Sequence, residues 1–204
     1  MQKKNDSLTV VLNGDWNKYY IQPAWIAQHV FELETIEVGI NYENDNVEVL
    51  FQSNNVVIRP TRSKVVFSAL SVEEETIGLF CKCVNNFLQK ATTPFLTSFG
   101  FNSDFLGDAA IFSELVDSMG ENCALIEAEA EIVNTRIEKT IRLGGKVYNL
   151  SSSIDSQSKF ILHINEHNEG PFEANNYPVI SKEVVETFWK NCWKIANALG
   201  YEED

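Results

Sequence analysis

The sequence has few histidines, a shortage of basic residues and no long hydrophobic run, and each shortage argues against a class of function. No apolar run approaches the roughly 18 residues that a membrane-spanning helix requires. The apolar segment 8–12 is too short for the core of a signal peptide. We therefore expect a cytoplasmic protein that does not enter a membrane.

The charge of the chain is strongly negative. It contains 29 acidic residues and 16 basic ones, a formal net charge of -13 at pH 7. Such a charge repels polyanions at long range, so binding to nucleic acid or to an anionic membrane is disfavoured. It keeps a cytoplasmic protein soluble, and it also suits a face that binds a basic partner or that imitates nucleic acid.

The cysteines give no sign of a metal or redox site. They are Cys81, Cys83, Cys123 and Cys192. The only close pair lies in a helical pattern, where residues two apart point in different directions and cannot share a zinc ion. Thiols stay reduced in the cytoplasm, so we expect all four to be structural and expect no cofactor.

Two of the three histidines belong to the segment HINEH, residues 163–167, which matches the H-x-x-E-H signature of the inverted zincin peptidases. That chemistry needs a helix, because residues four apart on a strand are separated by about 13 Å. Apolar and polar residues alternate from 159 to 167, and Gly170-Pro171 follows, so the pattern predicts a strand. A third ligand is also missing. We expect no metal centre, and adventitious metal binding at the surface is the remaining alternative.

Other catalytic motifs are absent from the sequence. It contains no G-x-S-x-G nucleophile elbow, and Gly144-Gly145 lies between two predicted strands, which indicates a hairpin turn and not a phosphate loop. Glu127, Glu129 and Glu131 alternate along one predicted strand and are expected to form a solvated outer face. The sequence therefore predicts no catalytic residues, and the balance is against an enzyme.

The hydrophobic pattern predicts the fold class. Alternation predicts strands over residues 8–12, 36–40, 47–51, 56–59, 64–70, 92–101, 124–132, 137–143, 147–150 and 160–164. Apolar spacings of three and four predict helices that begin at Pro23, Ser71, Asp104 and Ser181, with Ser71 and Glu74 forming a capping box.

This order predicts an α+β fold, in which an antiparallel β-meander sheet is packed on one face by amphipathic helices. The order of meander and helix occurs twice, which suggests pseudo-duplicated halves. We expect a single domain over residues 1–204, and a boundary near residue 120, giving 1–120 and 121–204, is the alternative.

Three groups of residues are candidates for binding. Arg59, Arg62 and Lys64 surround a predicted turn and can capture a carboxylate, a phosphate or an acidic partner, or can pair with the chain's own acids. His163 and His167 are the polar groups that a ligand would meet first. Trp193 lies beside the main apolar stripe of the last helix, where an exposed aromatic ring would mark an interface.

Two hypotheses for the function follow. The first is a non-enzymatic cytoplasmic protein that binds another protein through an acidic or aromatic sheet face or edge, as an adaptor, an immunity-type inhibitor or a chaperone does. The second is a small-ligand-binding protein or enzyme with a cavity between a curved antiparallel sheet and the C-terminal helix, residues 181–199. Sheet edges would also allow a homo-oligomer.

Overall fold

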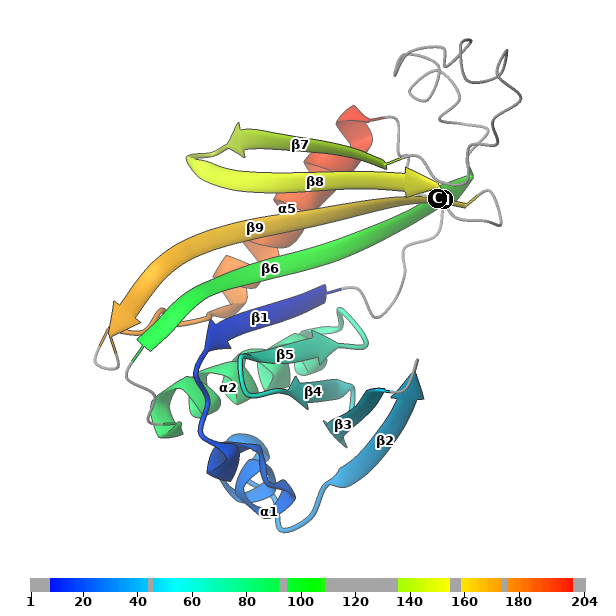
Figure 1. The fold of residues 1–204 in the computed structure, drawn as a ribbon. Helices are drawn as coiled ribbons and strands as arrows, with labels where there is room; N and C mark the ends of the chain where they lie inside the picture. The colour runs from blue at the N-terminus through cyan, green and yellow to red at the C-terminus, as the bar shows by residue number, and fades with distance from the viewer. Residues whose placement is uncertain are drawn as a thin grey trace.

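The computed structural model describes residues 8–43, 46–91, 95–108, 136–154, 159–173 and 176–199. In this part of the chain the strands form one nine-stranded sheet with the order β2-β3-β4-β5-β1-β6-β9-β8-β7 (Figure 1). Every neighbouring pair is antiparallel. The strands are β1 (Leu8–Gly14), β2 (Glu37–Glu43), β3 (Asn46–Ser53), β4 (Val56–Pro60), β5 (Lys64–Ala69), β6 (Phe95–Asp108), β7 (Arg136–Leu143), β8 (Lys146–Ile154) and β9 (Lys159–Glu173).

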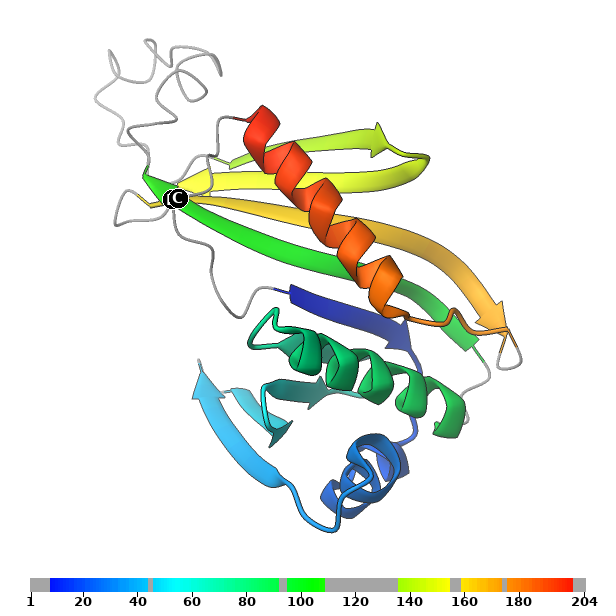
Figure 2. The same ribbon diagram turned by 180° about the vertical axis from the view of Figure 1, so that it is seen from behind.

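The two long helices, α2 (Glu74–Lys90) and α5 (Lys182–Ala198), cross the same face of the sheet (Figure 2). A shorter helical stretch packs against α2 and consists of η1 (Lys18–Ile21), α1 (Pro23–Trp25) and η2 (Ile26–Phe31). This arrangement confirms the predicted α+β fold with helices on one face of an antiparallel sheet. Among the described residues, no helix combines the length and the apolar character needed to cross a membrane.

The chain follows the same path twice. β1 begins the first unit, the strands β2 to β5 return to pair with β1, and α2 follows. β6 begins the second unit, β7 to β9 return to pair with β6, and α5 follows. The two units meet where β1 pairs with β6 at the centre of the sheet. Residue 120, the predicted boundary, lies outside the described residues, and the division into domains stays a prediction.

The predicted Gly144-Gly145 hairpin is confirmed. Both glycines have a positive φ, 60° and 80°, and they join β7 to β8. This left-handed backbone is the conformation that a two-residue hairpin turn requires and that glycine adopts without strain.

The cap of the last helix is confirmed, and the capping box of α2 is wrong. The Ser181 side chain accepts a hydrogen bond from the Val184 amide at the start of α5. In α2 the N-cap residue is Glu73, which makes no capping bond with its side chain. The Ser71 hydroxyl instead accepts a hydrogen bond from the Glu73 amide at 3.1 Å, so it orders the turn before the helix.

The helix predicted to begin at Asp104 is also wrong at that residue. Asp104 lies within β6, which continues to Asp108, because Ser103 and Phe105 point into the core while Asp104 points away from it. The rest of that predicted helix, the predicted strand 124–132 with its glutamates and Cys123 lie outside the described residues.

The core lies between the sheet and the helices. One row of directly paired residues on the helix-bearing face runs from β3 to β7 and consists of Phe51, Ile58, Phe67, Val10, Phe101, Glu166, Tyr148 and Ile141. Phe188 of α5 stacks on Phe101 and Tyr148, with ring centroids 5.4 and 6.5 Å apart. Phe87 of α2 contacts Phe67 edge to face, with ring centroids 5.6 Å apart. Both long helices therefore place a phenylalanine ring on the same continuous row of the sheet.

Replacement of Phe188 should test this packing. Phe188 is almost fully buried, so Phe188→Ala should lower the free energy of unfolding by about 3–5 kcal/mol, as for other large cavities. Urea denaturation measures the change. Val184→Ala on the exposed side of the same helix is the control and should change it by less than about 0.5 kcal/mol. Equal effects of the two substitutions would contradict the packing of α5.

Candidate functional site

The HINEH segment is confirmed as a strand. It lies within β9, and the alternate residues Phe160, Leu162, Ile164 and Glu166 are buried under α5. His163 and His167 therefore point to the opposite face of the sheet. Among the described residues, no group of three or more His, Cys, Asp or Glu side chains is placed to hold a metal ion.

His163 is held by a carboxylate from the neighbouring strand. Its Nδ1 lies 2.5 Å from Oδ1 of Asp104, its direct partner across β6. Ser151 of β8 is its partner on the other side. No hydrogen bond joins the Ser151 hydroxyl to the His163 ring within the described part of the chain. Asp104 therefore orients the His163 imidazole, but Ser151 is not hydrogen-bonded to this ring as a nucleophile would be.

The predicted basic cluster surrounds the turn between β4 and β5. Arg59 donates to the Ser68 hydroxyl at 3.0 Å and lies 3.9 Å from the Glu48 carboxylate. Arg62 pairs with Asp15 at 3.2 Å on the surface. Two of the three cations thus pair with carboxylates of the chain itself. Lys64 is exposed at the start of β5.

Trp193 belongs to the contact between α5 and the sheet. Its ring meets Phe105 of β6 edge to face at 5.1 Å and Trp189 at 6.3 Å. The predicted candidates are consequently not brought together. The basic cluster lies at the β4–β5 turn, the histidines lie on the open face of β9, and Trp193 lies on the helix-bearing face.

A buried polar cluster was missed in the sequence. The Glu166 carboxylate lies on the helix-bearing face, where it accepts a hydrogen bond from the Tyr148 hydroxyl at 2.9 Å and pairs with Lys146 at 3.0 Å. Asn191 of α5 donates to the same hydroxyl at 2.8 Å. The signal was present, because Glu166 falls on the apolar side of the alternation in residues 160–166. The cluster ties α5 to β8 and β9.

Burial changes the acidity of several groups in this core. It raises the pKa of the Tyr148 hydroxyl, and the nearby Glu166 carboxylate adds to the effect. Burial raises the pKa of Cys81 to about 11 and that of Cys83 to about 12. Burial, reinforced by Glu166, also raises the pKa of Cys192. These three thiols are free and protonated at neutral pH, so they are poor nucleophiles.

The open face of the sheet carries a chain of side-chain hydrogen bonds. Thr140, Asn149, Asn165, Asn102 and Thr9 are directly paired across β7, β8, β9, β6 and β1. Successive members of this row are 2.9, 3.3, 2.8 and 3.2 Å apart, each donating to the next. Polar side chains therefore satisfy one another on this face, which needs no covering helix.

Surface hollows occur in several places in the described region. One of about 280 Å³ lies between α2 and α5 and is lined in part by Val72, Ile77, Val185 and Trp189. Another, of about 320 Å³, lies on β7, β8 and β9, and its lining includes His163. A small one, of about 20 Å³, lies where Leu199 approaches β7 and β8. The interface of α5 with the sheet is itself filled by aromatic side chains.

The two edges of the sheet differ in their side chains. β7 is one edge, and it carries the exposed charged residues Arg136, Glu138, Lys139 and Arg142. Charges of this kind protect an edge strand against pairing with other chains. β2 is the opposite edge, and it has no lysine or arginine.

Apolar side chains are exposed on β2 and its neighbour β3. The exposed fractions are 48% for Val38, 56% for Ile40, 61% for Val47 and 37% for Val49. We call these four residues the edge strip. They lie on the same face as Phe51, but α2 packs over β4 and β5, and the β2–β3 hairpin extends beyond it (Figure 2). The edge strip is therefore apolar surface that no described helix covers.

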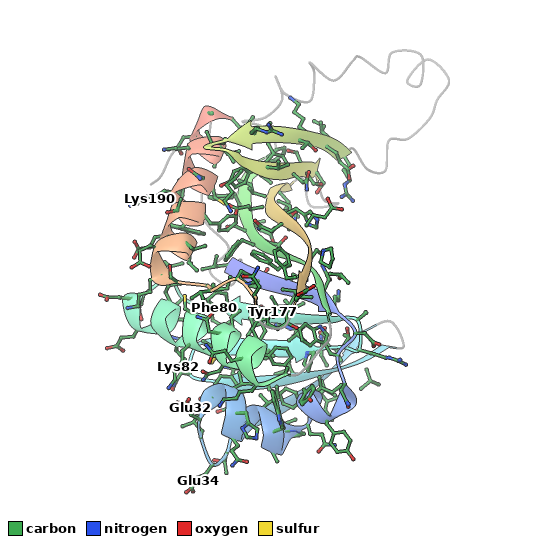
Figure 3. The ribbon with its side chains drawn as sticks, turned by 90° about the vertical axis from the view of Figure 1, so that its left-hand side faces the viewer. Glu32, Glu34, Phe80, Lys82, Tyr177 and Lys190 are labelled. Atoms are coloured by element: carbon green, nitrogen blue, oxygen red, sulfur yellow. The ribbon has the colours of Figure 1, made fainter. Side chains whose placement is uncertain are left out.

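The edge strip lies in the most acidic part of the first unit. Residues 19–58 contain six acidic residues, which are Glu32, Glu34, Glu37, Glu43, Asp45 and Glu48, and no lysine or arginine. Glu32 is paired at 2.6 Å with Lys82 of α2 (Figure 3). Glu34 and Glu37 are exposed. The β2–β3 hairpin thus combines exposed apolar side chains with an excess of negative charge.

Comparison with protein-family models finds no match to this chain, and none of the curated proteins is significantly similar to it in sequence. The functional argument therefore depends on the geometry described above.

The buried cluster makes a specific prediction for Tyr148. Tyr148→Phe leaves the Asn191 amide without its buried acceptor and removes one partner of the Glu166 carboxylate, which keeps Lys146, so it should lower the free energy of unfolding by about 1–3 kcal/mol at pH 7. The pKa of the Tyr148 hydroxyl is raised in the folded state, so this group stabilises the fold at a pH below its unfolded-state pKa of about 10. The contribution is lost as the pH rises above that pKa. The difference in the free energy of unfolding between wild type and Tyr148→Phe should therefore become smaller above about pH 10.

Urea denaturation as a function of pH measures both effects. Tyr19→Phe is the matched control, because the Tyr19 side chain is exposed. A constant difference between Tyr148→Phe and wild type across the alkaline range would contradict the assigned role of the hydroxyl.

Proposed function

We propose that this protein is a non-enzymatic, cytoplasmic interaction protein that binds another protein through its β2–β3 hairpin. The observation that carries the proposal is the contrast between the two sheet edges. Charges of both signs lie along β7, whereas β2 carries only acidic charges and presents Val38 and Ile40 beside an unpaired backbone edge. An edge strand with exposed apolar side chains is a site where another chain can add a strand.

The state of the cysteines supports the cytoplasmic part of this proposal. Cys81, Cys83 and Cys192 are free thiols in the core. Thiols persist in a reducing compartment, where disulfides are rare.

The charge of the hairpin favours a different protein over a second copy of this chain as the partner. Pairing β2 with β2 of another copy would bring together two acidic strands, and like charges in adjacent strands are destabilising. A partner with complementary charge avoids this cost and gains faster association.

Ile40→Lys should abolish the capture of the partner. It places a charge in the edge strip without removing buried packing, because Ile40 is more than half exposed. The tagged full-length protein would be used to capture partners from a lysate of its native host. Proteins captured by wild type should be lost with Ile40→Lys and kept with Val179→Lys, a control at a residue that is 71% exposed outside the hairpin.

Hydrogen exchange then locates the contact. The purified partner should slow amide exchange in residues 37–53 of this chain. Capture that is equal for wild type and Ile40→Lys, or protection elsewhere, would contradict the proposed surface. Light scattering that showed a dimer dependent on Ile40 would assign the edge to a second copy and would also contradict it.

Small-ligand binding is a second candidate function, supported by the hollow beside His163. Asp104 fixes the imidazole, and the hollow is otherwise lined largely by polar side chains such as Asn149 and Asn165. A ligand with hydroxyl or carboxylate groups would suit this surface.

A thermal-shift screen against metabolites tests the ligand hypothesis. Compounds that use the hollow should raise the melting temperature of wild type and of His167→Gln but not that of His163→Gln. His167 is a matched control because it lies on the same face of β9 and does not line the hollow. Compounds that act equally on all three proteins would exclude His163 from binding.

A further inference from the structure

We infer that the partner segment is a basic, amphipathic strand that pairs with the free edge of β2, with apolar side chains toward the edge strip and lysine or arginine toward the opposite face. This inference depends on the proposed function and specifies the chemistry of the partner. It follows from the register of β2 and β3, from the two faces of the hairpin and from its charge.

The register defines which groups an added strand would meet. β2 pairs with β3 from Glu37 opposite Gln52 to Glu43 opposite Asn46, along its whole length. Its other side has no neighbour in the described sheet. Half of its backbone amides and carbonyls are therefore directed toward that side, as in any edge strand, and can bond to another extended chain.

The two faces of β2 differ in chemistry. Val38 and Ile40 lie on the helix-bearing face, where Ile40 is directly paired with Val49. Glu37, Gly39 and Asn41 alternate with them and lie on the open face, where Asn41 is directly paired with Glu48. An added strand would continue this alternation, so one set of its side chains extends the edge strip and the other set lies beside the acidic face.

The charge of the open face specifies which partner side chains would lie beside it. Glu37 is exposed and belongs to none of the ion pairs of the described residues, and Glu48 lies at a loose 3.9 Å from Arg59. Lysine or arginine on the partner strand would meet Glu37 in the adjacent strand, where opposite charges stabilise cross-strand pairs. Acidic side chains at the same positions would be repelled.

Gly39 contributes to the shape of this face. A Cβ atom at residue 39 would lie 2.7 Å from the Leu50 side chain, so Leu50 of β3 occupies the space that glycine leaves. No side chain projects between Glu37 and Asn41 on the outer edge strand. A long basic side chain of a partner strand would therefore place its aliphatic part beside Leu50 at this position.

A peptide series tests the inference with full-length protein. The probe is the fluorescently labelled peptide VKVKVKV, which has the length of β2. The controls are VEVEVEV, which reverses the charge, and VVVVKKK, which keeps the composition and removes the alternation. Fluorescence anisotropy should show binding of VKVKVKV that is at least about tenfold tighter than that of either control. Binding of VKVKVKV should weaken as the salt concentration rises from about 50 to about 500 mM.

Two variants separate the charged face from the apolar face. Glu37→Lys and Ile40→Lys should each weaken binding of VKVKVKV by about tenfold or more. Glu186→Lys on α5 makes the same change in net charge as Glu37→Lys, away from the hairpin, and should leave binding unchanged. Circular dichroism melting confirms that each variant is folded. Hydrogen exchange should show that bound VKVKVKV protects amides of β2.

The outcomes distinguish this inference from the proposed function. Equal binding of VKVKVKV and VEVEVEV, or binding without protection of β2, would overturn the basic-strand inference. If the natural partner is lost with Ile40→Lys but retained with Glu37→Lys, the interaction function stands and the basic partner is wrong. If neither substitution affects capture, both proposals fail.

Discussion

The antiparallel pairing of β1 with β6 is the contact on which the rest of the structure depends. It joins the two units of the chain into one sheet, from Thr9 opposite Asn102 to Gly14 opposite Leu96. Side chains reinforce it, since Asn13 donates to Ser98 at 2.9 Å and the Thr97 hydroxyl donates to the Asn13 carbonyl at 2.9 Å. Because β1 and β6 are central, α2 and α5 are placed next to each other on one face. The core row from β3 to β7 is continuous only through this pair.

The same pairing determines where the sheet ends. Each unit starts at the centre and returns to it, so the strands that come first in each meander, β2 and β7, become the edges. The row of hydrogen-bonded polar residues from Thr9 to Thr140 crosses the second unit and leaves its open face satisfied without a helix. In the first unit, α2 packs mainly on β4 and β5. The apolar side chains of the β2–β3 hairpin therefore remain exposed to water, and this follows from the topology.

Local patterns predicted the elements better than their assembly. The alternation around HINEH was sufficient for a strand, and the Ser181 cap and the Gly144-Gly145 turn follow from short-range chemistry. The prediction failed at Asp104, since an aspartate is common at a helix N-cap and the pairing of β6 with β9 overrides that preference. The strand order is a long-range property that no local pattern contains. For that reason the sequence did not separate the covered Val10 from the exposed Val47, whereas the burial of Glu166 was visible in the local alternation.

The exposure of the edge strip and the acidity around it are physically linked. Val38, Ile40 and their neighbours on β3 are β-branched residues that favour strands, and on an uncharged edge such a surface promotes aggregation. Six acidic residues without a basic one in the same region place like charges on every approaching copy of the chain. The repulsion acts against self-association and leaves chains of opposite charge free to approach. One distribution of charge can therefore oppose self-association of an apolar edge and favour the basic partner that we propose, whereas charges of both signs protect the β7 edge.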